Sequence, residues 1–211
     1  MKRAEIVKII KKEKIVAIVR MKEQLEVPAF INSLIKGGIK ALEITSNTPG
    51  FSEEIANARN LYSQFGVLIG AGTVTNIEIA KEAIKAGAQF LVTPNTNIEV
   101  IKIAHMHDIP VLMGAVTPTE VCVAIENGAD IIKLFPAGSL GINYFKSIKA
   151  PLDKIDFFVV GGINLSNIKD WMEAGASGVG LGSVLTQTTI REGDINPIES
   201  TVKKFIQLIQ N

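Results

Sequence analysis

The sequence predicts an α/β protein built as a single (β/α)8 TIM barrel with one extra helix at the N-terminus. Short, continuously apolar segments alternate with helix-like segments along the chain, a pattern typical of a parallel sheet covered on both faces. Eight such apolar segments can be counted, the number that closes a barrel. No linker or low-complexity segment divides the chain, so residues 1–211 are expected to form one domain.

The segments that we interpret as strands are short, and most are bounded by glycine, proline or polar residues. They lie at residues 15–20, 39–45, 67–74, 89–95, 109–116, 131–135, 156–163 and 177–183. A helix stop followed by a strand start recurs before several of them, as in GGIKA, AGAQF, NGADI and AGASG. This recurrence indicates a repeated strand-helix unit.

Helices are expected before the first strand and between successive strands. They are predicted at residues 2–13, 23–37, after Gly50 to Tyr62, from Asn76 to Ala86, after Asn95 to His107, from Thr117 to Asn127, and at 144–148, 165–174, 183–190 and 197–210. Asn76 is expected to cap its helix. Thr117 and Pro118 are expected to begin another helix, with Glu120 in its first turn and Cys122 buried on it.

The composition argues against several classes of partner. The chain has 22 basic and 21 acidic residues and a net charge of +1, with no charge block of the kind that binds nucleic acid or a membrane surface. The charged N-terminal segment lacks the apolar stretch of a signal peptide, and no run is long enough to span a bilayer. With a single cysteine as well, we expect a cytoplasmic protein with no nucleic-acid or membrane partner.

Lys133 is an ionisable residue in the middle of the apolar strand at 131–135. Burial disfavours the charged ammonium and lowers the pKa of a lysine, which leaves a neutral amine able to attack a carbonyl carbon. One hypothesis is therefore a lysine that forms a Schiff base. The alternative is a lysine whose stem packs in the strand while its head reaches water.

Glu43 provides a carboxyl group that is expected to face the interior of the barrel. Because side chains alternate along a strand, Leu42 and Ile44 should meet the helices, while Ala41 and Glu43 should point inward. An inward carboxyl is unfavourable unless it is paired or used in chemistry. Glu43 is therefore interpreted as an ion-pair partner or proton shuttle for Lys133, and the two roles are compatible.

Other candidate site residues follow from the rule that barrel sites lie at the C-terminal ends of the strands. That rule selects Arg20, Thr73, Pro94 and Phe135 in addition to Lys133 and Glu43. Glycines in FVVGGI and GVGLGS follow the seventh and eighth strands, where barrels commonly bind phosphate. We predict a phosphate site there, formed by Gly161, Gly162, Gly182 and Ser183. Plain turns are the alternative.

No metal site and no cofactor are predicted. His105 and His107 are two residues apart near a helix end, a spacing that does not place them on one helix face. They are interpreted as surface or helix C-terminal residues.

Several strings occur in an order that matches a known family: LEIT, GAGTV, TPN, VTPTE, KLFPA, GGI and the ending GxGS. Together they resemble the bacterial KDPG/KHG aldolases, which are 2-keto-3-deoxy-6-phosphogluconate and 2-keto-4-hydroxyglutarate aldolases. The resemblance extends from about Ile15 to Ser183. It implies a class I, metal-independent lyase that acts through a Schiff base on a small-molecule substrate and is typically a homotrimeric barrel.

The resemblance also implies a role for individual residues. Lys133 would form the Schiff base with pyruvate, and Glu43 would move protons. Thr73 and Pro94 would line the pyruvate pocket, with Phe135 beside the imine. Gly161, Gly162 and Ser183 would hold the phosphate.

Three strings depart from the family pattern. Many members have LRT after the glutamate motif, with an arginine that binds the substrate carboxylate, whereas this chain has SNT with Asn47 at that position. Asn47 is therefore a candidate for substrate binding, and Arg20 is the candidate for the missing cation. The usual PTGGI is VVGGI, so Val160 replaces a threonine near the substrate's C4 hydroxyl. In TPN, Asn95 takes a position where glycine is common.

The expected reaction is the cleavage of 2-keto-3-deoxy-6-phosphogluconate, or a close relative, to pyruvate and glyceraldehyde 3-phosphate. The C4-epimeric 6-phosphogalactonate substrate and 4-hydroxy-2-oxoglutarate are the alternatives. A phosphate-binding barrel isomerase or synthase and a non-catalytic ligand-binding barrel also remain open.

Overall fold

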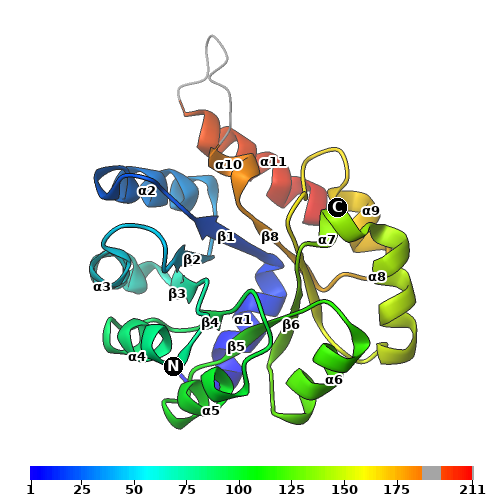
Figure 1. Ribbon diagram of the computed structural model, residues 1–211. Coiled ribbons are helices and arrows are strands. Elements are labelled where there is room, and N and C mark those ends of the chain that lie inside the picture. The colour runs from blue at the N-terminus through cyan, green and yellow to red at the C-terminus, as the bar shows by residue number, and fades with distance from the viewer. Residues whose placement is uncertain (187–195, 211) are drawn as a thin grey trace.

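The computed structural model describes residues 1–186 and 196–210. Eight parallel strands form a closed barrel in the order β1-β2-β3-β4-β5-β6-β7-β8, with helices around the outside (Figure 1). The strands are β1 (Ile15–Val19), β2 (Ala41–Thr45), β3 (Leu68–Gly72), β4 (Leu91–Val92), β5 (Val111–Ala115), β6 (Ile131–Leu134), β7 (Phe157–Val160) and β8 (Gly178–Leu181). The predicted fold class is confirmed.

The helices follow the strands along the chain, with one helix preceding the first strand. They are α1 (Arg3–Glu13), α2 (Val27–Gly37), α3 (Phe51–Tyr62), α4 (Ile77–Lys85), α5 (Ile98–Met106), α6 (Pro118–Glu126), α7 (Ala137–Leu140), α8 (Ile142–Lys149), α9 (Ile168–Glu173), α10 (Ser183–Thr186) and α11 (Pro197–Gln210). Short 3₁₀ helices are η1 (Gln24–Glu26), η2 (Ser63–Phe65) and η3 (Ala150–Leu152). None of the helices in the described ranges is both long enough and apolar enough to cross a membrane.

Side chains alternate between two apolar layers along each strand, as the period of two requires. In β2, Leu42 and Ile44 belong to the large layer between the barrel and the helices, whereas Ala41 belongs to a smaller cluster inside the barrel. That inner cluster contains Val16, Ala41, Leu68, Phe90, Val92, Leu112, Ile131 and Phe158. These residues fill the N-terminal part of the barrel, so the space for a site lies toward the C-terminal ends of the strands.

The extra N-terminal helix closes one end of the barrel. Ile6 and Ile10 of α1 are buried against the inner cluster, and α1 lies across the barrel in the view of Figure 1. Ion pairs hold the helix in place, from Arg3 to Asp130 and from Lys11 to Asp156. His105, in the last turn of α5, also contacts Asp130.

Two helix starts have the predicted caps. The Asn76 side chain accepts a hydrogen bond from the Ile79 N–H, and Thr117 and Glu120 form a reciprocal capping box at α6. The Glu120 carboxylate accepts hydrogen bonds from the backbone N–H groups of Thr117 and Val116. These bonds, the one from Thr117 most of all, lower the pKa of Glu120 against the opposing effect of burial.

The structure differs from the sequence-based prediction in several places. The strand β4 has only two residues, because only Leu91 and Val92 pair with β5. The helix α7 was not predicted, and α9 begins at Ile168 rather than Leu165. Cys122 does lie on α6, but the prediction that it is buried was wrong, because the residue faces solvent. In the helix predicted at 183–190, residues 187–190 lie outside the described residues.

Candidate active site

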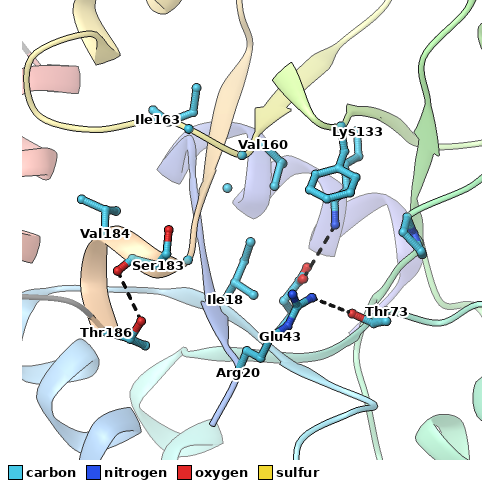
Figure 2. Close-up of a pocket in the computed structure, with 16 residues that line it drawn as sticks. Ile18, Arg20, Glu43, Thr73, Lys133, Val160, Ile163, Ser183, Val184 and Thr186 are labelled. Atoms are coloured by element: carbon cyan, nitrogen blue, oxygen red, sulfur yellow. Dashed lines mark hydrogen bonds and ion pairs between the residues drawn. The ribbon is translucent and has the colours of Figure 1, made fainter. Parts of the chain in front are cut away.

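A cavity of about 260 Å³ opens at the C-terminal ends of the strands (Figure 2). Its lining comes from strands β1, β2, β6, β7 and β8, from the loops after β1, β3, β4, β6, β7 and β8, and from the helix α10. The lining residues are Ile18, Arg20, Glu43, Thr73, Pro94, Lys133, Phe135, Val160, Gly161, Gly162, Ile163, Gly180, Gly182, Ser183, Val184 and Thr186. The cavity therefore brings together residues from nearly the whole length of the chain.

Lys133 projects into this cavity from the middle of β6. Its neighbours Ile132 and Leu134 belong to the outer apolar layer, so the alternation along the strand turns Lys133 inward. The residue as a whole is only 6 % exposed. Its Nζ lies 4.0 Å from Oε1 of Glu43 and 5.3 Å from the centre of the Phe135 ring.

Glu43 comes from the middle of β2 and points toward Lys133 (Figure 2). It is 2 % exposed, which is rare for a carboxyl group. Space for the carboxyl exists because residue 72, at the end of β3, is a glycine. A Cβ atom on Gly72 would overlap the Glu43 carboxyl group.

Burial shifts the pKa values of both groups toward their neutral forms. Desolvation lowers the pKa of Lys133, an effect that the Glu43 carboxylate opposes and the Arg20 guanidinium reinforces. Desolvation raises the pKa of Glu43, against the opposing effects of Lys133 and Arg20. Both shifts favour a neutral Lys133 amine, which is the nucleophilic form, beside a protonated Glu43 carboxyl.

Arg20 lies beside this pair, directly after β1. Its guanidinium donates a hydrogen bond to the Thr73 hydroxyl, with 3.2 Å between Nη2 and Oγ1 (Figure 2). Thr73 follows β3 and has a backbone φ of 55°, which is unusual for a residue other than glycine. Among the described residues that line the cavity, Arg20 and Lys133 supply the positive charge.

Neutral polar groups and glycine loops form the other side of the cavity. Gly161 and Gly162 have φ values of 92° and 77°, in the left-handed region, and the Gly138 N–H donates to the Gly161 carbonyl at 2.7 Å. Ser183 begins α10 and, with Thr186, lies across the cavity from Lys133 and Thr73 (Figure 2). One side of the site is thus charged and the other neutral.

The predicted residues reach the cavity with one exception. Arg20, Glu43, Thr73, Pro94, Lys133, Phe135, Val160, Gly161, Gly162, Gly182 and Ser183 all line it. Asn47, in the turn after β2, is exposed and is not among the described residues that line the cavity. The hydroxyl of its neighbour Ser46 donates a hydrogen bond to the Thr73 carbonyl, in the loop after β3, at 2.8 Å.

Five lining residues were not identified from the sequence: Ile18, Ile163, Gly180, Val184 and Thr186. The period of two could have found Ile18 and Gly180, since each lies between two residues of the outer apolar layer on β1 or β8 and must therefore face inward. Thr186 and Val184 reach the cavity from the short helix α10, which lies within the helix predicted at 183–190, but the prediction did not indicate which of its residues face the site. In the described ranges, no group of three or more His, Cys, Asp or Glu side chains is arranged to hold a metal ion.

Comparison with known proteins identifies relatives over most of the chain. The 2-dehydro-3-deoxy-6-phosphogalactonate aldolase of Escherichia coli (strain K12) is 38 % identical over 172 residues, covering 81 % of this chain and 83 % of that protein. The 2-dehydro-3-deoxy-phosphogluconate aldolase of Treponema pallidum (strain Nichols) is 30 % identical over 198 residues, covering 93 % of each.

A solved structure agrees with these sequence relatives. It is a cube-shaped, highly porous protein cage designed by fusing symmetric oligomeric domains. It is 34 % identical to this chain, with a TM-score of 0.85. The matched region covers 94 % of this chain and 73 % of the cage protein. The sequence profile of the family "KDPG and KHG aldolase" matches residues 6–201. The protein is therefore a member of the KDPG and KHG aldolase family of lyases.

Proposed function

We propose that this chain is a class I aldolase that cleaves a 2-keto-3-deoxy-6-phospho-hexonate into pyruvate and glyceraldehyde 3-phosphate, with Lys133 as the Schiff-base residue. The observation that carries the proposal is the buried pair of Lys133 and Glu43 at 4.0 Å, facing a cavity in a member of an aldolase family. An amine with a lowered pKa beside a proton-carrying carboxyl is the arrangement that imine chemistry requires.

The first half of the reaction forms the imine. The neutral amine of Lys133 attacks the C2 ketone of the substrate and gives a carbinolamine. Glu43 protonates the departing hydroxyl, water leaves, and a protonated imine remains. General acid–base assistance of this kind is worth roughly 10²–10⁴-fold in rate.

The second half breaks the bond between C3 and C4. The Glu43 carboxylate accepts the proton of the C4 hydroxyl, and the electrons of the C3–C4 bond flow into the imine. Glyceraldehyde 3-phosphate leaves, and an enamine is left on Lys133. Protonation of the enamine at C3 and hydrolysis of the imine release pyruvate and restore the free amine.

The two sides of the cavity suit the two charged ends of such a substrate. Arg20, with Thr73, lies on the side of Lys133 and is proposed to hold the C1 carboxylate, with Pro94 and Phe135 packing around the pyruvate portion. The opposite side offers Gly161, Gly162, Gly182 and Ser183 for the 6-phosphate. Backbone N–H groups and a hydroxyl bind phosphate well without a cation.

The configuration at C4 is the open feature of the substrate, and one observation favours the galactonate epimer. Val160 lines the cavity from the end of β7 and has no hydroxyl to bond the C4 hydroxyl of the gluconate epimer. The relative with 38 % identity is named for the phosphogalactonate substrate, and the relative with 30 % identity for phosphogluconate. We therefore propose both epimers as substrates, with the galactonate epimer preferred. For 4-hydroxy-2-oxoglutarate, the phosphate loops would have no partner.

A panel of substrates tests this proposal. Both C4 epimers and 4-hydroxy-2-oxoglutarate would be supplied separately, and pyruvate release would be followed with coupled lactate dehydrogenase. We expect release from both phosphorylated epimers, with the higher kcat/KM for the galactonate epimer. Ser183→Ala should raise KM for the phosphorylated substrates about 3- to 10-fold, the value of one hydrogen bond, and leave 4-hydroxy-2-oxoglutarate unaffected. Release from none of the three would contradict the proposal and favour a non-catalytic barrel.

We propose further that the protein acts as a cytoplasmic homotrimer and that residues 1–211 form one domain. The similarity to a cage built from symmetric oligomeric domains supports an oligomer. Sedimentation analysis would test this, since a trimer has three times the mass of the 22.7 kDa chain.

A further inference from the structure

The loop after β3 holds a residue in an unusual backbone conformation. Thr73 has a φ of 55°, in the left-handed region, where a β-branched residue is a conformational outlier. Such a conformation persists only where the surrounding contacts hold it, and it occurs preferentially at sites of ligand binding. The contacts that hold Thr73 therefore matter for the site that it lines.

Ser46, in the turn after β2, makes two of these contacts. Its hydroxyl donates a hydrogen bond to the Thr73 carbonyl at 2.8 Å, and its own N–H donates to the preceding carbonyl, that of Gly72, at 2.9 Å. One residue thus holds two successive carbonyl groups of the loop. On the other side of Thr73, the Val74 N–H donates to the Val92 carbonyl at 3.1 Å.

The segment held in this way contacts two functional groups on the Lys133 side of the cavity, the Arg20 guanidinium and the Glu43 carboxyl. The Thr73 hydroxyl accepts the hydrogen bond of the exposed Arg20 guanidinium at 3.2 Å. Gly72 lies against the carboxyl group of Glu43. A shift of the loop would therefore move the anchor of Arg20 and the wall behind Glu43.

We infer that Ser46 is a positioning residue for substrate binding: by holding the Thr73 carbonyl, it fixes the Thr73 hydroxyl where that hydroxyl anchors Arg20 over the carboxylate of the keto acid. Ser46 does not itself line the cavity among the described residues, so it acts through Thr73. The inference rests on the proposed function of Arg20 as the carboxylate-binding residue. It assigns to the serine of the SNT string the contribution that Asn47, exposed beside it, does not make.

Three variants test the inference, with pyruvate as the ligand and borohydride trapping of the imine as the readout. Ser46→Ala removes the hydroxyl, Ser46→Thr keeps it, and Ser147→Ala is a matched control. Ser147 donates an equivalent hydrogen bond to the Asn143 carbonyl at 2.9 Å on the exposed side of α8. We expect Ser46→Ala to raise the half-saturating pyruvate concentration about 3- to 10-fold, with the trapping rate at saturation changed less than about twofold. Ser46→Thr should restore the parent value.

A double-mutant cycle with Arg20→Ala separates positioning from a general structural effect. If Ser46 acts through Thr73 and Arg20, Ser46→Ala should have no further effect on half-saturation once Arg20 is absent. Equal effects in both backgrounds would overturn the inference, and so would a loss that Ser46→Thr fails to restore.

A crystal structure of the unliganded Ser46→Ala variant tests the contact without any activity. We expect Thr73 to leave its left-handed conformation or to lose its hydrogen bond to Arg20. An unchanged loop with the Arg20 contact intact would overturn the inference whatever the kinetics show. If the parent protein traps no pyruvate, the proposed function fails, while the crystal structure still decides whether Ser46 holds the loop.

Discussion

Lys133 Nζ and Glu43 Oε1 lie 4.0 Å apart inside the barrel, with side chains that are 7 % and 2 % exposed. This separation exceeds the length of a direct hydrogen bond, but it keeps the two groups electrostatically coupled in a poorly solvated site. Each group favours its neutral form because of burial, and each opposes that tendency in the other. The proposed chemistry depends on this balance.

The balance predicts opposite pH shifts for two substitutions. Imine formation needs the neutral amine of Lys133, so the trapping rate should fall as the pH drops through the lowered pKa of that amine. Glu43→Gln removes a negative charge that raises this pKa, so the acid limb of the profile should move to lower pH. Arg20→Ala removes a positive charge that lowers it, so the acid limb should move to higher pH. The pH profile of borohydride trapping checks both signs, and shifts in the same direction would contradict the electrostatic account.

Two glycines on β3 provide a matched test of the position of Glu43. A Cβ atom on Gly72 would overlap the Glu43 carboxyl, whereas one on Gly70 would meet the ring of Phe90 in the inner cluster. Gly72→Ala should therefore reduce kcat at least about 100-fold, the value of a misplaced acid–base group. Gly70→Ala should destabilise the fold by about 1–3 kcal/mol through overpacking and leave kcat within a few-fold. Steady-state kinetics and denaturant unfolding of both variants decide the matter, and similar kcat losses would argue against a specific effect on Glu43.

Substitutions of Arg20 and Asn47 are expected to have contrasting effects on binding of the substrate carboxylate. Arg20 lines the cavity and Asn47 is exposed outside it, so Arg20→Ala should raise KM for the keto acid about 10-fold, as expected for the loss of a charged hydrogen bond. Asn47→Ala should leave KM within about twofold of the parent value. Steady-state KM measurements at a fixed pH compare them. Small and equal effects would mean that backbone N–H groups hold the carboxylate instead.

Val160→Thr tests the choice between the C4 epimers. The two side chains have nearly the same shape, but threonine adds a hydroxyl at the cavity wall. A new hydrogen bond to the C4 hydroxyl should shift the ratio of kcat/KM values about 3- to 10-fold toward the gluconate epimer. Parallel assays with both epimers give the ratio directly. An unchanged ratio would show that the residue at position 160 does not discriminate between the two configurations at C4.

Much of this site could be predicted because strands impose a strict alternation. The inward direction of Glu43 follows from the apolar character of Leu42 and Ile44 alone, and the loop positions follow from the barrel rule. This alternation cannot predict the parts of the site that are formed by loops, because loop residues follow no regular period. The left-handed conformation of Thr73 and the hydrogen bond that Ser46 donates to its carbonyl depend on contacts between two loops that are distant in sequence.

The errors have related causes. Asn47 is expected at the site because of its place in a motif, but the turn after β2 directs Ser46 toward the Thr73 carbonyl and leaves Asn47 exposed. Cys122 is predicted to be buried on its helix, whereas its neighbour Val121 fills the buried position of α6. The orientation of a helix about its own axis, rather than the hydrophobicity of one residue, determines which side chains are buried against the barrel.

Chemical trapping of Lys133 tests the central claim most directly. The protein would be incubated with pyruvate and borohydride, digested, and analysed by mass spectrometry, with Lys133→Met as a control whose fold is checked by circular dichroism. The account predicts a reduced pyruvate adduct on the peptide that contains Lys133 and none in the Lys133→Met protein. An unmodified Lys133 in the parent protein, or an adduct on a different lysine, would contradict it.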